Sequence, residues 1–152
     1  MKKLLLIVVC LLLLTGCKNN FNNEANNNII QNNTIKESDD KLLSIKAIIN
    51  NKKYTLKLED NETVKEFVNL LPQEFTMSEL NGNEKYVYMN NNLITNSYNP
   101  KHIEKGDVML YGNNCLVIFY KSFDTSYNYT KIGHIDNLDN INSGSIIAKF
   151  EK

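Results

Sequence analysis

Residues 107–121, DVMLYGNNCLVIFYK, hold two short apolar runs that the turn-forming residues GNN separate. The runs DVMLY and CLVIF each have the length of a β-strand, and the Gly-Asn-Asn between them favours a hairpin. Because CLVIF is apolar at consecutive positions, a strand there needs cover on both of its faces. This pattern predicts the wall of a closed barrel with a helix packed outside it.

Further strands are expected on both sides of this hairpin. Alternating apolar and polar residues predict a hairpin across 45–58 that turns at Asn50 and Asn51. The turn signal NGN at 81–83 separates the strands EFTMSEL and EKYVYM, and a polar connection follows at 90–106. YNYTKIGHI and SIIAKF supply two more strands. Many short strands with one or two helices indicate a mainly β fold, an all-β barrel.

The clearest helix is predicted in NETVKEFVNLLP, residues 61–72. Thr63 and Glu66 have the spacing of a capping box, and Pro72 ends the run. We expect the apolar face of this helix to close one open end or face of the sheet. That face consists of residues at helical spacing: Val64, Phe67, Val68 and Leu71.

The first seventeen residues have the layout of a secretory signal. A basic start, MKK, precedes eleven apolar residues, fewer than the roughly 20 that a membrane-spanning helix needs. LTGC at 14–17 resembles the lipobox of bacterial lipoproteins, whose cysteine is acylated and becomes the first residue of the mature chain. We therefore expect a lipoprotein signal peptide over 1–16, lipid attachment at Cys17, and anchoring at the extracytoplasmic face of the cell membrane.

The segment that follows is rich in asparagine and shows no apolar period, so it cannot bury enough surface to fold. Residues 17–40, which begin with the acylated cysteine, are therefore predicted to be a disordered tether, and 41–152 one folded domain. Cys115 is then the only cysteine in that domain. No disulfide can form inside the domain, and the apolar neighbours of Cys115 favour a buried, inert thiol.

Composition restricts the partners. Seventeen basic residues balance seventeen acidic ones and the charges are interspersed, so we expect no nucleic-acid partner. We also expect the domain to be a monomer. Every basic residue is lysine, which excludes any mechanism that needs a guanidinium fork. The glycines mark turns rather than a phosphate loop and no flavin signature is present, so we expect no cofactor.

Neither histidine has the neighbours of a metal or hydrolytic site. His102 and His134 lack a cysteine or a second histidine at ligand spacing, so we expect no metal. Asp124, Ser126 and His134 supply the residue types of a hydrolytic triad. In an extended strand, however, Ser126 and His134 would lie about 26 Å apart, too far for the hydrogen bond that a triad needs.

Three segments in chain order carry a family resemblance: LPQEFTMSELNGNEKY at 71–86, IEKGDVMLYGNNCLVIFYKSF at 103–123 and YTKIGHI at 129–135. Together they resemble the bacterial cyclophilin-like family of small secreted or flavodoxin-linked domains, over nearly all of residues 44–150. The resemblance implies the cyclophilin fold, a closed eight-stranded β-barrel with one or two capping helices. That fold agrees with the strand pattern described above.

The resemblance also bears on activity. Cyclophilins isomerise prolyl bonds, which have a barrier of about 18–20 kcal/mol, by holding a peptide in an apolar groove while an arginine donates to the proline amide. This chain has no arginine, no tryptophan and no FHR segment, so the donor has no counterpart. A non-catalytic binding module for a peptide, a small ligand or a partner protein is therefore favoured. The alternatives are a divergent prolyl isomerase and an accessory to a flavodoxin-type redox protein.

The run FDTSYNYTKIGHI, residues 123–135, supplies most of the candidate groove. We expect this run to be a barrel strand, whose alternation places Tyr127, Tyr129 and Lys131 on one face. Tyrosine suits a groove because it offers apolar area with a polar tip. The alternative interpretation is that the tyrosines are only cross-strand packing partners. The candidate ligand-binding residues are Tyr120, Phe123, Tyr127, Tyr129 and Thr130.

Overall fold

The DVMLY and CLVIF runs form the predicted hairpin, in which β6 (Asp107–Tyr111) and β7 (Cys115–Phe119) pair antiparallel. The computed structural model describes residues 43–139, 141 and 143–152. The expected signal peptide over 1–16, and Cys17 with its tether, lie outside the described residues.

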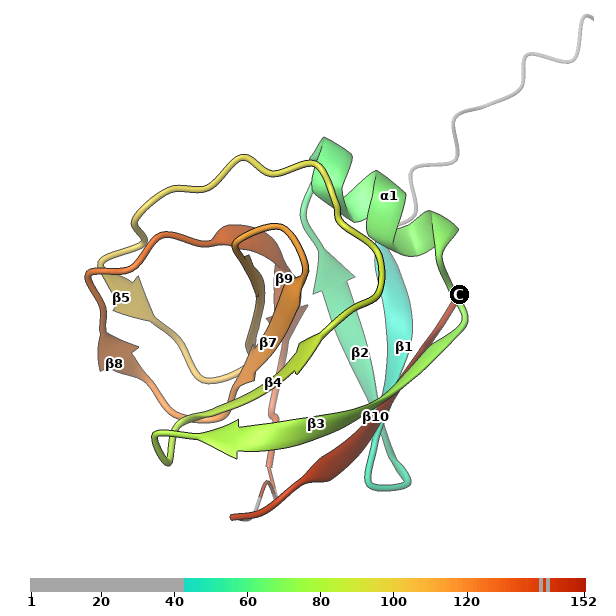
Figure 1. The fold of residues 1–152 in the computed structure, drawn as a ribbon. Coiled ribbons are helices and arrows are strands. Elements are labelled where there is room, and N and C mark those ends of the chain that lie inside the picture. The colour runs from blue at the N-terminus through green and yellow to red at the C-terminus, as the bar shows by residue number, and fades with distance from the viewer. Residues whose placement is uncertain (1–42, 140, 142) are drawn as a thin grey trace, which may run out of the picture. The chain divides into compact units, whose positions relative to one another are not determined.

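The predicted mainly β fold, a closed barrel of eight strands, is confirmed. The strands follow one another around the barrel in the order β1-β10-β3-β4-β7-β6-β9-β2, and every neighbouring pair is antiparallel (Figure 1). Besides β6 and β7, the barrel strands are β1 (Ser44–Ile49), β2 (Lys52–Leu58), β3 (Gln73–Leu80), β4 (Glu84–Tyr88), β9 (Thr130–Ile135) and β10 (Ile146–Glu151).

The turn between β1 and β2 lies where the asparagines predicted it. Asn50 and Asn51 both have positive φ, 46° and 66°. This is the left-handed backbone of the tight hairpin turns that match the twist of the strands, and asparagine adopts it more readily than most residues. Local turn chemistry therefore sets the register of the first hairpin.

The side chains of β6 and β7 alternate between two apolar clusters. Leu116 and Ile118 of β7 belong to the main core inside the barrel, together with Val108 and Leu110 of β6. The other three residues of β7 belong to a second cluster on the outer face: Cys115, Val117 and Phe119. All five residues of β7 are buried, which confirms that CLVIF is covered on both faces.

The cover on the outer face is not the helix that we expected. It comes from a separate two-stranded sheet in which β5 (His102–Ile103) pairs with β8 (Phe123–Asp124), as Figure 1 shows beside the barrel. Ile103 and Phe123 pack against the outward residues of β7, and the rings of Phe123 and Phe119 lie 5.6 Å apart. A strand that is apolar at consecutive positions indicates that both of its faces are covered, but the pattern does not show whether a helix or a sheet covers them.

One helix forms in the described residues, α1 (Glu62–Asn69). Its Phe67 is fully buried in the barrel core, and the Phe67 ring meets the ring of Phe150 at 5.5 Å and 76°. In Figure 1, α1 lies across one end of the barrel, beside the ends of β1 and β2. The expected role of this helix in closing the barrel is confirmed.

The predicted capping box is wrong. The helix is capped by Asn61, which has extended backbone (φ −148°) and whose side-chain oxygen accepts a hydrogen bond from the Val64 N–H at 2.9 Å. Thr63 and Glu66 instead bind the loop that follows β4. The Thr63 hydroxyl donates to the Ile94 carbonyl at 2.6 Å, and Glu66 accepts from the Ile94 N–H at 2.6 Å. Thr63 and Glu66 have the spacing of a local capping box, but both hydrogen-bond to the distant residue Ile94 instead.

The run 123–135 is not one strand. Its first two residues form β8, its last six form β9, and residues 125–129 connect them. The alternation expected for Tyr127, Tyr129 and Lys131 therefore does not apply. Tyr127 is 61% exposed, whereas Tyr129 is only 5% exposed.

In the part of the chain that the structure describes, no helix is long and apolar enough to cross a membrane.

Candidate functional site

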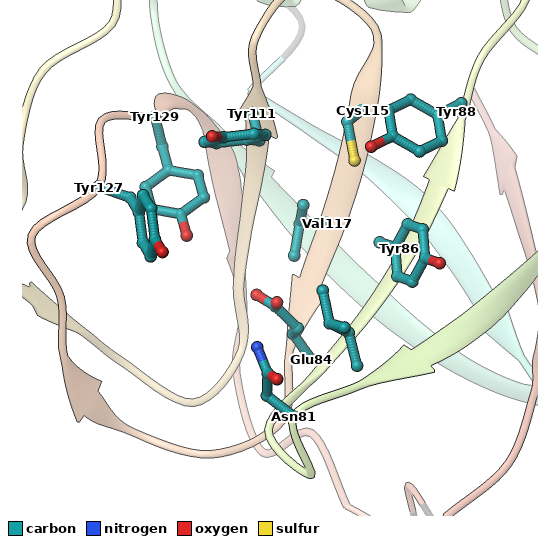
Figure 2. Close-up of a pocket in the computed structure, with 10 residues that line it drawn as sticks. Asn81, Glu84, Tyr86, Tyr88, Tyr111, Cys115, Val117, Tyr127 and Tyr129 are labelled. Carbon is teal, nitrogen blue, oxygen red and sulfur yellow. The ribbon is translucent and has the colours of Figure 1, made fainter.

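A pocket of about 280 Å³ opens on the outer face of the barrel, above β4 and β7 (Figure 2). Its position follows from strand alternation, because the side chains of β7 that point away from the barrel core face this pocket. Five of the lining residues are tyrosines, and none is basic. The lining residues are Leu80, Asn81, Glu84, Tyr86, Tyr88, Tyr111, Cys115, Val117, Tyr127 and Tyr129.

The register between β4 and β7 shapes the pocket. Tyr86 lies opposite Val117, and Tyr88 lies opposite Cys115. Two small side chains on β7 thus form a floor beside two long side chains on β4. The sequence EKYVY places Glu84 on the same face as the two tyrosines, two residues before Tyr86.

Tyrosine rings form two walls on either side of this floor (Figure 2). The β4 wall consists of Tyr86 and Tyr88, whose rings meet edge to face with centroids 5.9 Å apart. The Tyr111 wall consists of Tyr111, Tyr127 and Tyr129. Within it, the Tyr111 ring lies 6.1 Å from the ring of Tyr127 and 5.6 Å from the ring of Tyr129. Figure 2 shows Val117 between the two walls.

Tyr129 is the fixed member of the Tyr111 wall. Its backbone exchanges two hydrogen bonds of 2.9 Å with the backbone of Tyr98, and its ring packs against the ring of Phe119 at 5.5 Å. Burial, followed by the negative charge of Glu84, raises the pKa of Tyr129 to about 12. The phenol therefore stays neutral at physiological pH.

Glu84 is the acidic residue of the pocket, and only 8% of it is exposed. Burial and, secondarily, the charge of Glu79 raise the pKa of the Glu84 carboxyl. Among the described residues, no hydrogen bond and no ion pair involves this carboxylate, and Figure 2 places it between the two walls. The pocket thus combines a negative charge with aromatic ring faces.

Cys115 lies in the pocket floor and is 5% exposed. Burial, with a further contribution from the charge of Glu84, raises the pKa of its thiol to about 11. The reactive form of cysteine is the thiolate, which this environment suppresses. The expectation that Cys115 is buried is confirmed, and its surroundings are those of an unreactive thiol.

The structure brings two of the five candidate groove residues, Tyr127 and Tyr129, into the pocket lining. Tyr120 lies elsewhere, where its hydroxyl donates to Glu79 at 2.6 Å and its ring lies 4.9 Å from the Nζ atom of Lys85. Lys85 is fully buried and pairs with Glu79, so Tyr120 belongs to a partly buried polar cluster.

The other two candidates also lie outside the lining. Phe123 packs on Phe119 and helps to cover β7. Thr130 is 1% exposed, and its hydroxyl accepts a hydrogen bond from the Asn96 N–H at 3.1 Å. Both residues support the elements around the pocket without facing it.

Eight of the ten lining residues were not among the candidates, and four of these eight form the tyrosine walls or carry the charge: Glu84, Tyr86, Tyr88 and Tyr111. Three of them share one face of EKYVY, so alternation contained a signal for them. Alternation did not determine which face of β4 points to the pocket, because each face carries a charged residue, Glu84 on one and Lys85 on the other.

The two histidines each pair with a carboxylate away from the pocket. His102 Nδ1 lies 2.6 Å from Asp124 Oδ1, and this hydrogen bond raises the pKa of His102. His134 Nδ1 lies 3.0 Å from Asp107 Oδ1. Asp124 and His134 therefore have different partners. Within the described residues, no three His, Cys, Asp or Glu side chains form a group that could hold a metal ion.

Comparison with protein families found one match. A model described as the cyclophilin-like family matches residues 47–151, which include every residue of the pocket lining. Searches of curated proteins and of solved structures found no match.

Proposed function

The chain belongs to the cyclophilin-like family, and we propose that it is a non-catalytic binding module whose tyrosine-lined pocket receives the ligand. The ligand would be a small molecule, a peptide side chain or an exposed group of a partner protein. The observation that carries this proposal is a pocket that is aromatic and acidic and that contains no basic residue.

The composition of the lining supports binding without isomerase catalysis. In cyclophilins an arginine donates to the proline amide, and this chain contains no arginine. No lysine or histidine takes that place in the pocket either. The five tyrosines instead offer ring area at low entropic cost, with hydroxyls that can hydrogen-bond a ligand. The pocket volume, about 280 Å³, suits a small ligand or a single side chain.

We further propose that the module works on the outer side of the cell membrane. The basic start, the short apolar run and LTGC at 14–17 support a lipoprotein signal with acylation at Cys17. Two or three acyl chains would hold the protein at the membrane, because each buried CH₂ contributes about 0.8 kcal/mol. The asparagine-rich residues 18–40 would then separate the monomeric domain from the bilayer.

A fragment screen by NMR tests the binding function. The isotopically labelled protein is titrated with a set of small neutral, cationic and anionic fragments, and the backbone amide shifts are followed. We expect the largest shifts at the pocket floor, at Cys115 and Val117, and at Tyr86. Shifts confined to other surfaces, or no shifts with any fragment, would contradict the proposal.

An isomerase assay tests the absence of catalysis. With a proline-containing peptide, the rate should stay at that of the uncatalysed reaction. A rate within a few fold of an ordinary cyclophilin would overturn this part of the proposal.

A further inference from the structure

We propose that the pocket selects an organic cation, a methylated ammonium group on a short alkyl chain. This inference rests on the proposed binding function and adds the chemistry of the ligand. It comes from the placement of one unpartnered carboxylate, Glu84, between two walls of tyrosine rings (Figure 2).

Glu84 differs from the other buried charged residues in the described part of the chain. Asp107, which is 3% exposed, pairs with His134 at 3.0 Å and with Lys131 at 3.3 Å. Lys85 is fully buried, pairs with Glu79 and donates to a backbone carbonyl. Glu84 is the only one of these three side chains for which no hydrogen bond or ion pair is found.

An unpartnered carboxylate is costly to bury, so a positive ligand would offset a cost that the free protein bears. No basic residue lines the pocket, so nothing in the lining neutralises the charge of Glu84. The nearby carboxylate of Glu79 contributes further negative potential at Glu84. The electrostatic field of the pocket therefore favours cations and disfavours anions.

The tyrosine rings of the pocket also favour a positively charged ligand. The face of an aromatic ring carries partial negative charge, and a cation within about 6 Å of a ring centroid is attracted to it. Neighbouring rings in the Tyr111 wall are 5.6–6.1 Å apart, and those of the β4 wall are 5.9 Å apart. Rings on two sides of one small pocket suit a compact, rounded cation.

The number of polar groups argues for a methylated ammonium rather than a metal ion. Calcium takes about 6–8 oxygen ligands. Apart from the phenol hydroxyls, the lining offers only the Glu84 carboxylate and the Asn81 side-chain amide. A primary ammonium also has three N–H groups to satisfy. A quaternary ammonium has none, and its methyl groups can pack against the rings.

Calorimetry with choline as the probe tests the inference. Its neutral isostere, 3,3-dimethylbutan-1-ol, has the same shape without the charge and is titrated in parallel. We expect the full-length protein in detergent to bind choline roughly tenfold more tightly than the isostere, because charge and ring contacts act together. Equal affinity for the two probes would overturn the inference.

The Glu84→Gln variant tests the role of the carboxylate. It keeps the shape of the side chain and removes the charge, so choline affinity should fall about tenfold, towards that of the isostere. Glu74→Gln is the matched control, since Glu74 is exposed on β3 and lies outside the lining. The control should bind choline as the unmodified protein does. An unchanged affinity in Glu84→Gln would overturn the inference.

Displacement of choline by lipids distinguishes the two possible sources of the cation, a lipid headgroup and a free small molecule. Displacement by phosphatidylcholine in mixed micelles with the detergent, but not by phosphatidylglycerol in mixed micelles, would identify a lipid headgroup as the source of the cation. Displacement by neither would identify a free small molecule, and both results keep the ammonium chemistry. If neutral fragments bind at the pocket as tightly as choline, the cation inference fails while the binding module stands. If no fragment of any charge binds there, the binding function itself fails.

Discussion

The exposed ring of Tyr111, at the end of β6, lies 5.6 Å from the buried ring of Tyr129, which directly precedes β9. Tyr111 is 45% exposed and Tyr129 only 5%, so the inner ring supports the outer one. β6 and β9 are neighbours in the closed barrel. The pairing of β6 with β9 therefore positions one wall of the pocket.

Removing one exposed ring should weaken ligand binding without unfolding the protein. Tyr127 is 61% exposed and contacts Tyr111 at the pocket rim. We expect Tyr127→Leu to reduce choline affinity about two- to fivefold, the contribution of an exposed cation–π contact of roughly 0.5–1 kcal/mol. Tyr98→Leu is the control, because Tyr98 is 48% exposed and outside the lining. Equal losses in the two variants, measured by calorimetry, would contradict the prediction.

Choline binding should weaken as the solution becomes acidic. The Glu84 carboxyl must be ionised to attract a cation, and burial raises its pKa above the ordinary 4.5. Protonation of Glu84, and with it the loss of affinity, should therefore begin at a higher pH than for an exposed glutamate. Calorimetry at a series of pH values checks this. The pH dependence should be absent in Glu84→Gln.

The other titratable groups that face Glu84 should not produce this pH dependence. The pKa values of Cys115, about 11, and of Tyr129, about 12, keep both groups neutral in the acidic range. Burial acts to raise the pKa of Glu79, but hydrogen bonds from Lys85 and Tyr120 lower it overall. Glu79 therefore stays charged until lower pH than Glu84. An identical pH profile in the Glu84→Gln variant would rule out Glu84 as the titrating group.

The same substitution should stabilise the free protein at neutral pH. A carboxyl whose pKa is raised on folding is disfavoured in its charged form, so it destabilises the fold above its folded pKa. This loss disappears as the pH falls and the group becomes protonated. We expect Glu84→Gln to unfold at a higher temperature than the unmodified protein at neutral pH, with the difference shrinking in acid. A lower unfolding temperature at neutral pH would show that the carboxylate stabilises the fold.

Truncating the apolar anchor of α1 should destabilise the domain. Phe67 is fully buried, and its ring packs against Phe150 across the end of the barrel. We expect Phe67→Ala to lower the free energy of unfolding by about 3–5 kcal/mol, because the barrel core would be left with a cavity. Urea denaturation measures this. Phe67→Leu keeps most of the apolar volume and should cost less, and equal losses would contradict the cavity argument.

Replacing the expected acylation site should release the protein from the membrane. Cys17→Ser removes the thiol that the lipobox LTGC presents for acylation. Cell fractionation should then recover the variant in the soluble fraction and the unmodified protein with the membranes. Cys115→Ser is the control, because Cys115 is buried in the domain and should not affect the location. Membrane recovery of Cys17→Ser would contradict lipid anchoring at this position.

Much of the fold was predictable because its signals are local. Alternating apolar residues marked the strands, and Asn50 and Asn51 marked the first turn, where both adopt positive φ. The errors arose where distant contacts override a local pattern. Ile94 binds Thr63 and Glu66, which had the spacing of a capping box. The strands β5 and β8 have two residues each, too few to produce an apolar period.

The binding surface was less predictable than the fold. The side chains of EKYVY and CLVIF that share a face can be read from the sequence alone, because side chains alternate along any strand. The three-dimensional fold was needed to show that Glu84 and the β4 wall lie beside the floor of Cys115 and Val117, with Tyr111 and Tyr129 on the other side (Figure 2). Those strands become neighbours in the order β4-β7-β6-β9 through barrel closure. This pairing depends on how the whole apolar core is buried, and no short segment of the sequence contains that information.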